Sequence, residues 1–186
     1  MDRITRGDAL AGAFFLLAAA VYQPLLTDPG GYLTDAARGD GAVLGGAFLE
    51  ALLVVGVVGT AVCLYPLVRR HGEGLAVAYV AGRVLEAAII AMGIAAVLAS
   101  VAMRRDPPDG NDAMRATAAG LAGVHDATFL LGPGLAIGVN TLLLAALVHR
   151  AHLVPRAISW LGLVGGPLVF ASSTAVLFGA YEQMSP

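Results

Sequence analysis

Five ionisable side chains lie within stretches of the sequence that are otherwise almost entirely apolar. They are Glu50, Arg83, Glu86, His125 and Asp126. Such groups can bind a polar ligand, carry a proton, coordinate a metal ion or act as general acids and bases. An arginine at the centre of a membrane-spanning helix costs about 2.5 kcal/mol or more, so these residues should face protein, water or one another. They form the candidate functional site.

Arg83 and Glu86 belong to the segment Tyr79-Val-Ala-Gly-Arg83-Val-Leu-Glu86, inside the apolar run from Gly74 to Met103. Residues three positions apart share a helix face, so we expect the two charges to pair. One interpretation is structural: either a salt bridge between Arg83 and Glu86, or Arg83 bridging Glu50 and Glu86. The other is an anchor for an anionic ligand, because a guanidinium binds oxygen anions in a bidentate manner.

His125 and Asp126 are neighbours, so on a helix their side chains point about 100° apart. Each should therefore meet a different helix, either as an interhelical hydrogen bond or with His125 as a ligand or proton carrier. Estimated depths place the five candidate residues in one pocket that opens toward the outer face. The residues expected to surround this pocket are Gln23, Tyr65, Tyr79 and Asn140.

Metal and cofactor chemistry has little support in the sequence. Glu50, Glu86, His125 and Asp126 are acceptable ligands for zinc or iron, but no HxxxH or ExxH spacing places two ligands on one helix face. The sequence has no phosphate-binding loop, dinucleotide fingerprint or haem-attachment motif. It therefore identifies no cofactor and no catalytic residue.

The composition requires a membrane environment for these residues. Of 186 residues, 58% are hydrophobic and 13% are charged, and the mean hydropathy is +0.80. Soluble domains carry about 25% charged residues. We predict an all-α, polytopic transmembrane helix bundle that forms a single integral membrane domain over residues 1–186. The net charge of −2 gives no indication of a nucleic-acid partner.

The apolar runs predict five spans, at residues 8–26, 43–70, 75–103, 113–150 and 156–181. We interpret the first as an uncleaved span. The fourth run has 38 residues, far more than the ~20 that cross a bilayer, and Gly132-Pro133-Gly134 lies in its middle. A long helix kinked at Pro133 gives five spans, which we favour, and two short helices give six.

Arginines indicate the orientation. With five spans and a cytoplasmic N-terminus, six arginines lie at the inner ends of the spans and four in the outer segments. The inner set is Arg3, Arg6, Arg69, Arg70, Arg150 and Arg156. Since cytoplasmic loops are enriched in positive charge, we predict a cytoplasmic N-terminus and an outer C-terminus.

Pairs of glycines four residues apart occur in the last two predicted spans, at Gly134 and Gly138 and at Gly162 and Gly166. Such faces allow close approach of helix backbones. We expect these faces either to pack together or to join copies of the chain in a homo-oligomer.

Several segments, taken in order, resemble a known family. They are Gly59-Thr-Ala-Val-Cys-Leu-Tyr65-Pro66-Leu-Val-Arg69-Arg70, Glu73-Gly74-Leu-Ala, the Tyr79–Glu86 segment, His125-Asp126 before Phe129-Leu-Leu-Gly-Pro-Gly134, and Leu153-Val-Pro155-Arg156. They are similar to the bacterial membrane family catalogued as domain of unknown function 4386. The resemblance implies a small multi-pass bundle in the bacterial cell (inner) membrane. It implies no established activity and no catalytic residues.

The leading functional hypothesis is a membrane-embedded binding or sensing protein. Its ligand would be a small polar molecule, a lipid headgroup or a proton. We also expect the protein to contact the lipid bilayer that surrounds it. Three alternatives stay open: an intramembrane metal-assisted or acid–base hydrolase, a small transporter or proton pathway, and a structural subunit of a membrane complex.

Overall fold

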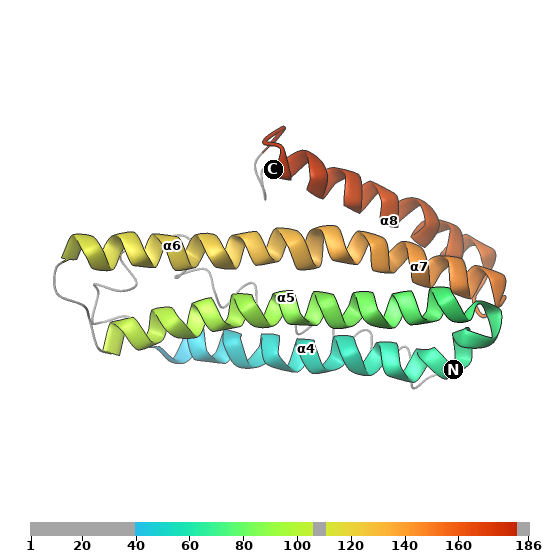
Figure 1. The fold of residues 1–186 in the computed structure, drawn as a ribbon, viewed down its shortest axis with the longest axis horizontal. Coiled ribbons are helices and arrows are strands. Elements are labelled where there is room, and N and C mark those ends of the chain that lie inside the picture. Colours follow the sequence, from blue (N-terminus) through green and yellow to red (C-terminus); the bar gives the residue numbers. More distant parts are fainter. Residues whose placement is uncertain (1–39, 106–110, 182–186) are drawn as a thin grey trace. The chain divides into compact units, whose positions relative to one another are not determined.

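The computed structural model describes residues 40–105 and 111–181, and the regular elements of this part of the chain are all helices (Figure 1). They are α4 (Gly41–Val68), the 3-10 helix η1 (Arg69–His71), α5 (Glu73–Arg105), α6 (Asn111–Phe129), the π-helix η2 (Leu130–Ala136), α7 (Ile137–Arg150) and α8 (Arg156–Leu177). The predicted all-helical class is therefore confirmed for the described residues.

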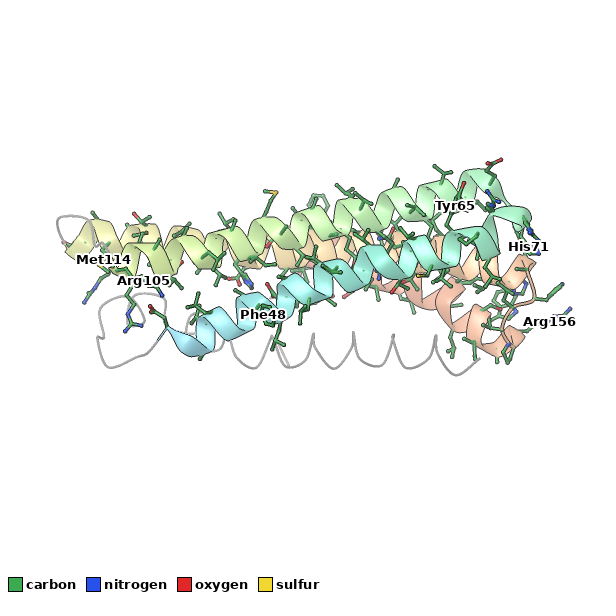
Figure 2. The ribbon with its side chains drawn as sticks, turned by 90° about the horizontal axis from the view of Figure 1, so that it is seen from below. Phe48, Tyr65, His71, Arg105, Met114 and Arg156 are labelled. Carbon is green, nitrogen blue, oxygen red and sulfur yellow. The ribbon has the colours of Figure 1, made fainter. Side chains whose placement is uncertain are left out.

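Four helical stretches of the described chain are long and apolar enough to cross a membrane: Gly41–His71, Glu73–Arg105, Asp112–Arg150 and Arg156–Leu177. They correspond to the second to fifth predicted spans. Large apolar side chains such as Phe48, which is 64% exposed, project from these helices (Figure 2), as expected of surfaces that contact lipid. The predicted first span lies outside the described residues, so the five-span count stays a prediction.

The predicted fourth span is one uninterrupted helical stretch through α6, η2 and α7. Pro133 lies within the π-helical segment, where the wider turn accommodates a residue that has no N–H to donate. The 39 residues from Asp112 to Arg150 would extend about 58 Å as an ideal α-helix, against a hydrocarbon core of about 30 Å. At Pro133, where the sequence predicts a kink in one long helix, the structure has a local change of helix type.

The chain packs as two compact units, which we describe separately. The first unit comprises the described residues of Met1–Gly56 and Ile90–Thr128, and the second those of Val57–Ile89 and Phe129–Pro186. The first unit has an apolar core around Val43, Val97 and Met114, and the second has one around Val68, Tyr79 and Leu147. Buried residues recur every three or four positions along α6, at residues 114, 118, 122, 125 and 128, which is the period of a helix with one inward face.

In the second unit, the glycine faces of the last two spans pack against each other. A Cβ added to Gly138 would lie 2.9 Å from the Gly166 carbonyl oxygen, and one added to Gly166 would lie 2.7 Å from that of Gly138. Gly134 packs against Ser173, and Gly162 against Ala145. The expected packing is confirmed, so the chain itself uses these glycine faces. Their alternative use in a homo-oligomer stays a prediction.

Candidate functional site

One face of α5 carries the candidate site of the second unit. Tyr79, Gly82, Arg83 and Glu86 are spaced at i, i+3, i+4 and i+7, which places them on one side of the helix. Tyr79 is 2% exposed and belongs to the apolar core that includes Leu147. Core packing therefore turns this face of α5 toward the protein interior.

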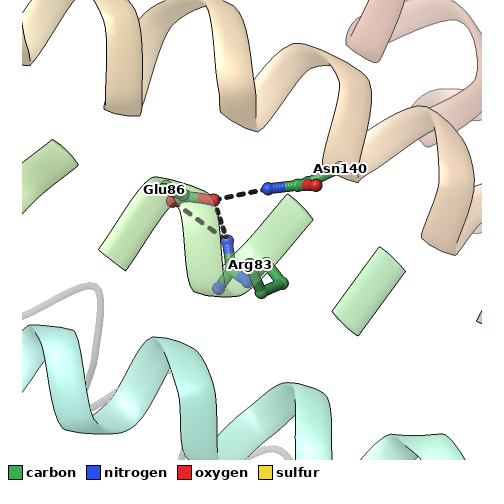
Figure 3. A network of polar contacts seen from close by, with 3 residues as sticks. All are labelled: Arg83, Glu86 and Asn140. Atoms are coloured by element: carbon green, nitrogen blue, oxygen red, sulfur yellow. Dashed lines mark hydrogen bonds and ion pairs between the residues drawn. The ribbon is translucent and has the colours of Figure 1, made fainter. Parts of the chain in front are cut away.

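Arg83 and Glu86 form an ion pair within α5. Arg83 Nη1 donates to Glu86 Oε1 at 3.1 Å and to Oε2 at 2.9 Å (Figure 3). The two side chains are 16% and 3% exposed, respectively. Removing a charge from water costs several kcal/mol, so each group requires the other in this position.

Asn140 joins the ion pair from α7. Its Nδ2 donates to Glu86 Oε2 at 2.7 Å, so the carboxylate accepts hydrogen bonds from two helices (Figure 3). Asn140 is 2% exposed. The sequence placed Asn140 only around the candidate pocket, whereas in the structure it contacts Glu86 directly. We call Arg83, Glu86 and Asn140 the polar network.

Gly82 provides the space that Asn140 occupies. A Cβ added to Gly82 would lie 2.0 Å from Asn140 Oδ1, so no side chain fits there while Asn140 keeps its position. Gly82 was not among the predicted site residues, because the approach of a residue 58 positions away leaves no local pattern in the sequence. The only feature of the sequence that could have indicated Gly82 is its position directly before the intramembrane charge of Arg83.

The polar network is not hydrogen-bonded throughout. Within the described part of the chain, the buried atoms Arg83 Nε and Asn140 Oδ1 have no hydrogen-bond partner. A buried polar group left in this state costs about 1–3 kcal/mol. Among its buried atoms, the network therefore retains one unmatched donor and one unmatched acceptor.

Glu50 and His125 approach each other in the first unit. His125 Nε2 lies 3.8 Å from Glu50 Oε1, which is beyond hydrogen-bond distance but close enough for electrostatic attraction when the imidazole is charged. Both residues are buried, at 8% and 4% exposed for Glu50 and His125. Asp126 Oδ1 lies 4.0 Å from His125 Nδ1, but the Asp126 side chain is 63% exposed.

Two residues that were not among the predicted site residues pack beside His125. Thr128 Oγ1 donates to the His125 carbonyl oxygen at 2.7 Å. A Cβ added to Gly93 would lie 2.5 Å from Thr128 Oγ1, so the missing side chain at Gly93 allows α6 to approach α5 here. Small residues thus support the placement of polar groups in this unit as well.

The remaining predicted site residues have separate positions. Tyr65 is partly buried, and the Arg69 guanidinium carbon lies 5.9 Å from the centroid of its ring. Gln23 lies outside the described residues.

Among the residues that the structure describes, no three His, Cys, Asp or Glu side chains are grouped so as to hold a metal ion. Since the polar network and the Glu50–His125 pair belong to different units, the single pocket predicted for all five residues stays a prediction.

Helices of membrane-spanning length with buried charged residues define a polytopic helical membrane protein. The family model described as Domain of unknown function (DUF4386) matches residues 9–186, so the chain belongs to this family and the resemblance seen in the sequence is confirmed. Searches of curated proteins and of solved structures found no match.

Proposed function

We propose that this chain is a membrane-embedded binding or sensing protein whose polar network receives a small polar ligand. The observation that carries the proposal is the incomplete hydrogen bonding of Arg83 Nε and Asn140 Oδ1. Buried polar groups in proteins are nearly always satisfied, and a network that served only to join α5 to α7 would be more stable with every group paired. The unmatched donor and acceptor are consistent with a site that is completed by another molecule.

The chemistry of the network favours a neutral or singly charged ligand. A guanidinium has five N–H donors, and among the described residues Arg83 donates only to Glu86, through Nη1. The remaining donors suit a carbonyl, carboxylate or other oxygen acceptor on the ligand. Because Glu86 already balances the charge of Arg83, a multiply charged anion would face repulsion from the carboxylate. The hydrolase, transporter and subunit alternatives have no comparable support within the described residues.

We further infer that the protein lies in the bacterial cell membrane with a cytoplasmic N-terminus and an outer C-terminus. The support is the arginine distribution: Arg69, Arg70, Arg150 and Arg156 lie at the helix ends assigned to the cytoplasm.

Native mass spectrometry of the full chain, released from mild detergent, tests the proposed function. The wild-type protein should carry a non-covalent adduct that the double variant Arg83→Met/Glu86→Gln lacks. This variant removes both charges and leaves an amide oxygen that can still accept from Asn140. Arg115→Met, an exposed site on α6, is the control and should retain the adduct.

Circular dichroism and size-exclusion chromatography must show that the double variant is folded. A wild-type protein without any adduct, or a folded double variant that retains it, would contradict the proposed function.

A further inference from the structure

An apolar groove of about 330 Å³ opens on the second unit, between the end of α4 and the beginning of α5. Its walls are formed by Val62, Tyr65, Val77, Val80 and Ala81. The volume is at the lower end of the roughly 300–1,000 Å³ typical of ligand sites. Since the walls are apolar except for the Tyr65 hydroxyl, the groove suits a hydrocarbon chain and not a polar molecule.

Positive charge lies at one end of this groove. The Arg69 guanidinium carbon is 5.9 Å from the centroid of the Tyr65 ring, so a wall residue of the groove contacts a cation directly. Arg70 follows in η1, and Arg150 Nη1 would lie 3.7 Å from a Cβ added to Gly72 in the same turn. Among the described residues, no carboxylate forms an ion pair with Arg69, Arg70 or Arg150.

The arginines and the groove are arranged like the two parts of a phospholipid. The 3-10 helix η1 joins two helices of membrane-spanning length and therefore lies where such helices meet the headgroup region. Tyr65 lies four residues before Arg69, and Val62 lies seven residues before it. These spacings place Tyr65 roughly 6 Å and Val62 roughly 10 Å deeper along the helix than Arg69. Figure 2 shows Tyr65 and His71 near the same end of the molecule's second unit.

We propose that the groove and its three arginines form a binding site for an anionic phospholipid. One acyl chain lies against Val62, Val77 and Ala81, and the phosphate is held by Arg69, Arg70 and Arg150. Basic residues at the ends of membrane helices attract anionic headgroups in this way. The site is separate from the polar network and does not depend on the proposed function.

The headgroup part of the proposal is tested with phosphatidylglycerol and phosphatidylcholine of equal chain length. Native mass spectrometry of the full chain, incubated with both lipids, measures how much of each is retained. Wild type should retain phosphatidylglycerol preferentially. Arg69→Gln/Arg70→Gln should weaken its retention by about fivefold per arginine and leave that of phosphatidylcholine unchanged. Arg115→Gln is the charge-matched control and should behave as wild type.

The groove part is tested by filling the groove. Ala81→Trp should abolish retention of phosphatidylglycerol, whereas Met92→Trp, an exposed position on α5 outside the groove, should preserve it. Val62→Trp fills the groove from α4 and replaces Ala81→Trp if that variant does not fold. Arg83→Met/Glu86→Gln should retain the lipid, which separates this proposal from the proposed function.

Three results would overturn the proposal. The first is normal lipid retention by both groove-filling variants. The second concerns the midpoint of thermal unfolding. A rise with inorganic phosphate alone that equals the rise with phosphatidylglycerol would show that no acyl chain is needed. The third is a dimeric wild type that retains no lipid and becomes monomeric in Ala81→Trp, which would assign the groove to a second copy of the chain.

Discussion

At the scale of single residues, the chain stabilises an intramembrane charge by pairing and by close packing. Glu86 accepts hydrogen bonds from Arg83 on its own helix and from Asn140 on α7. Gly82 leaves the space that brings Asn140 within reach. The geometry of the carboxylate therefore depends on a residue that has no side chain.

Replacing Gly82 by Ala should destabilise the protein by about 1–3 kcal/mol, since the new methyl group would displace Asn140 from Glu86. Gly74→Ala is the matched control on α5, where an added Cβ meets no atom within 4 Å. It should leave the stability unchanged or raise it slightly. The free energy of unfolding in detergent micelles measures both. Equal stabilities of the two variants would refute the role assigned to Gly82.

Removing one member of the Arg83–Glu86 pair should cost more than removing both. Glu86→Gln leaves a buried guanidinium without its carboxylate and should lower the free energy of unfolding by about 3–5 kcal/mol. Arg83→Met/Glu86→Gln should recover most of this loss, because no uncompensated charge remains. A double-mutant cycle of unfolding free energies measures the coupling. Additive losses from the two single variants would show that the residues do not stabilise each other.

At the scale of helices, the apolar runs predicted most boundaries within a few residues. The second predicted span, residues 43–70, is α4 with η1, and the third, residues 75–103, is α5. Charged, glycine and proline residues end these runs and mark the helix ends in the sequence. The π-helix at Leu130–Ala136 was not predicted, because Gly132-Pro133-Gly134 is equally compatible with a kink or a turn.

The packing of α7 on α8 gives a prediction at this scale. Gly166→Ala should lower the free energy of unfolding by about 1–3 kcal/mol, because its Cβ would meet the backbone of Gly138 and Leu142, which cannot move aside like a flexible side chain. Gly165→Ala is the adjacent control, with no atom within 4 Å of the added Cβ. Thermal unfolding of both variants distinguishes a helix contact from a general effect of alanine. A control as unstable as Gly166→Ala would contradict the packing account.

At the scale of the whole molecule, the sequence predicted the class of protein and the Arg83–Glu86 pairing, because composition and i,i+3 spacing are local properties. It could not predict that Asn140 contacts Glu86, since that contact depends on the rotation and depth of α7 relative to α5. The same limit applies to Asp126, whose exposed side chain could not be inferred from its position next to the buried His125. Contacts between helices require tertiary information that periodicity does not contain.

Membrane topology gives a whole-molecule prediction. In a Cys63→Ala background, which removes the single cysteine, we expect Asp112→Cys to react with a membrane-impermeant maleimide in intact cells. Leu153→Cys should react only after permeabilisation, because five spans with a cytoplasmic N-terminus place it inside. Labelling of Leu153→Cys in intact cells would instead support a six-span arrangement.

The central claim is that the polar network of Arg83, Glu86 and Asn140 is open to a ligand. An experimental density map of the full chain in a lipid bilayer disc, at a resolution that shows ordered water, tests it most directly. We expect non-protein density within about 3.2 Å of Arg83 Nε, in addition to the Glu86 and Asn140 contacts. A dry network in which Arg83 Nε and Asn140 Oδ1 are both hydrogen-bonded to protein would contradict the claim and assign the charges to structural support.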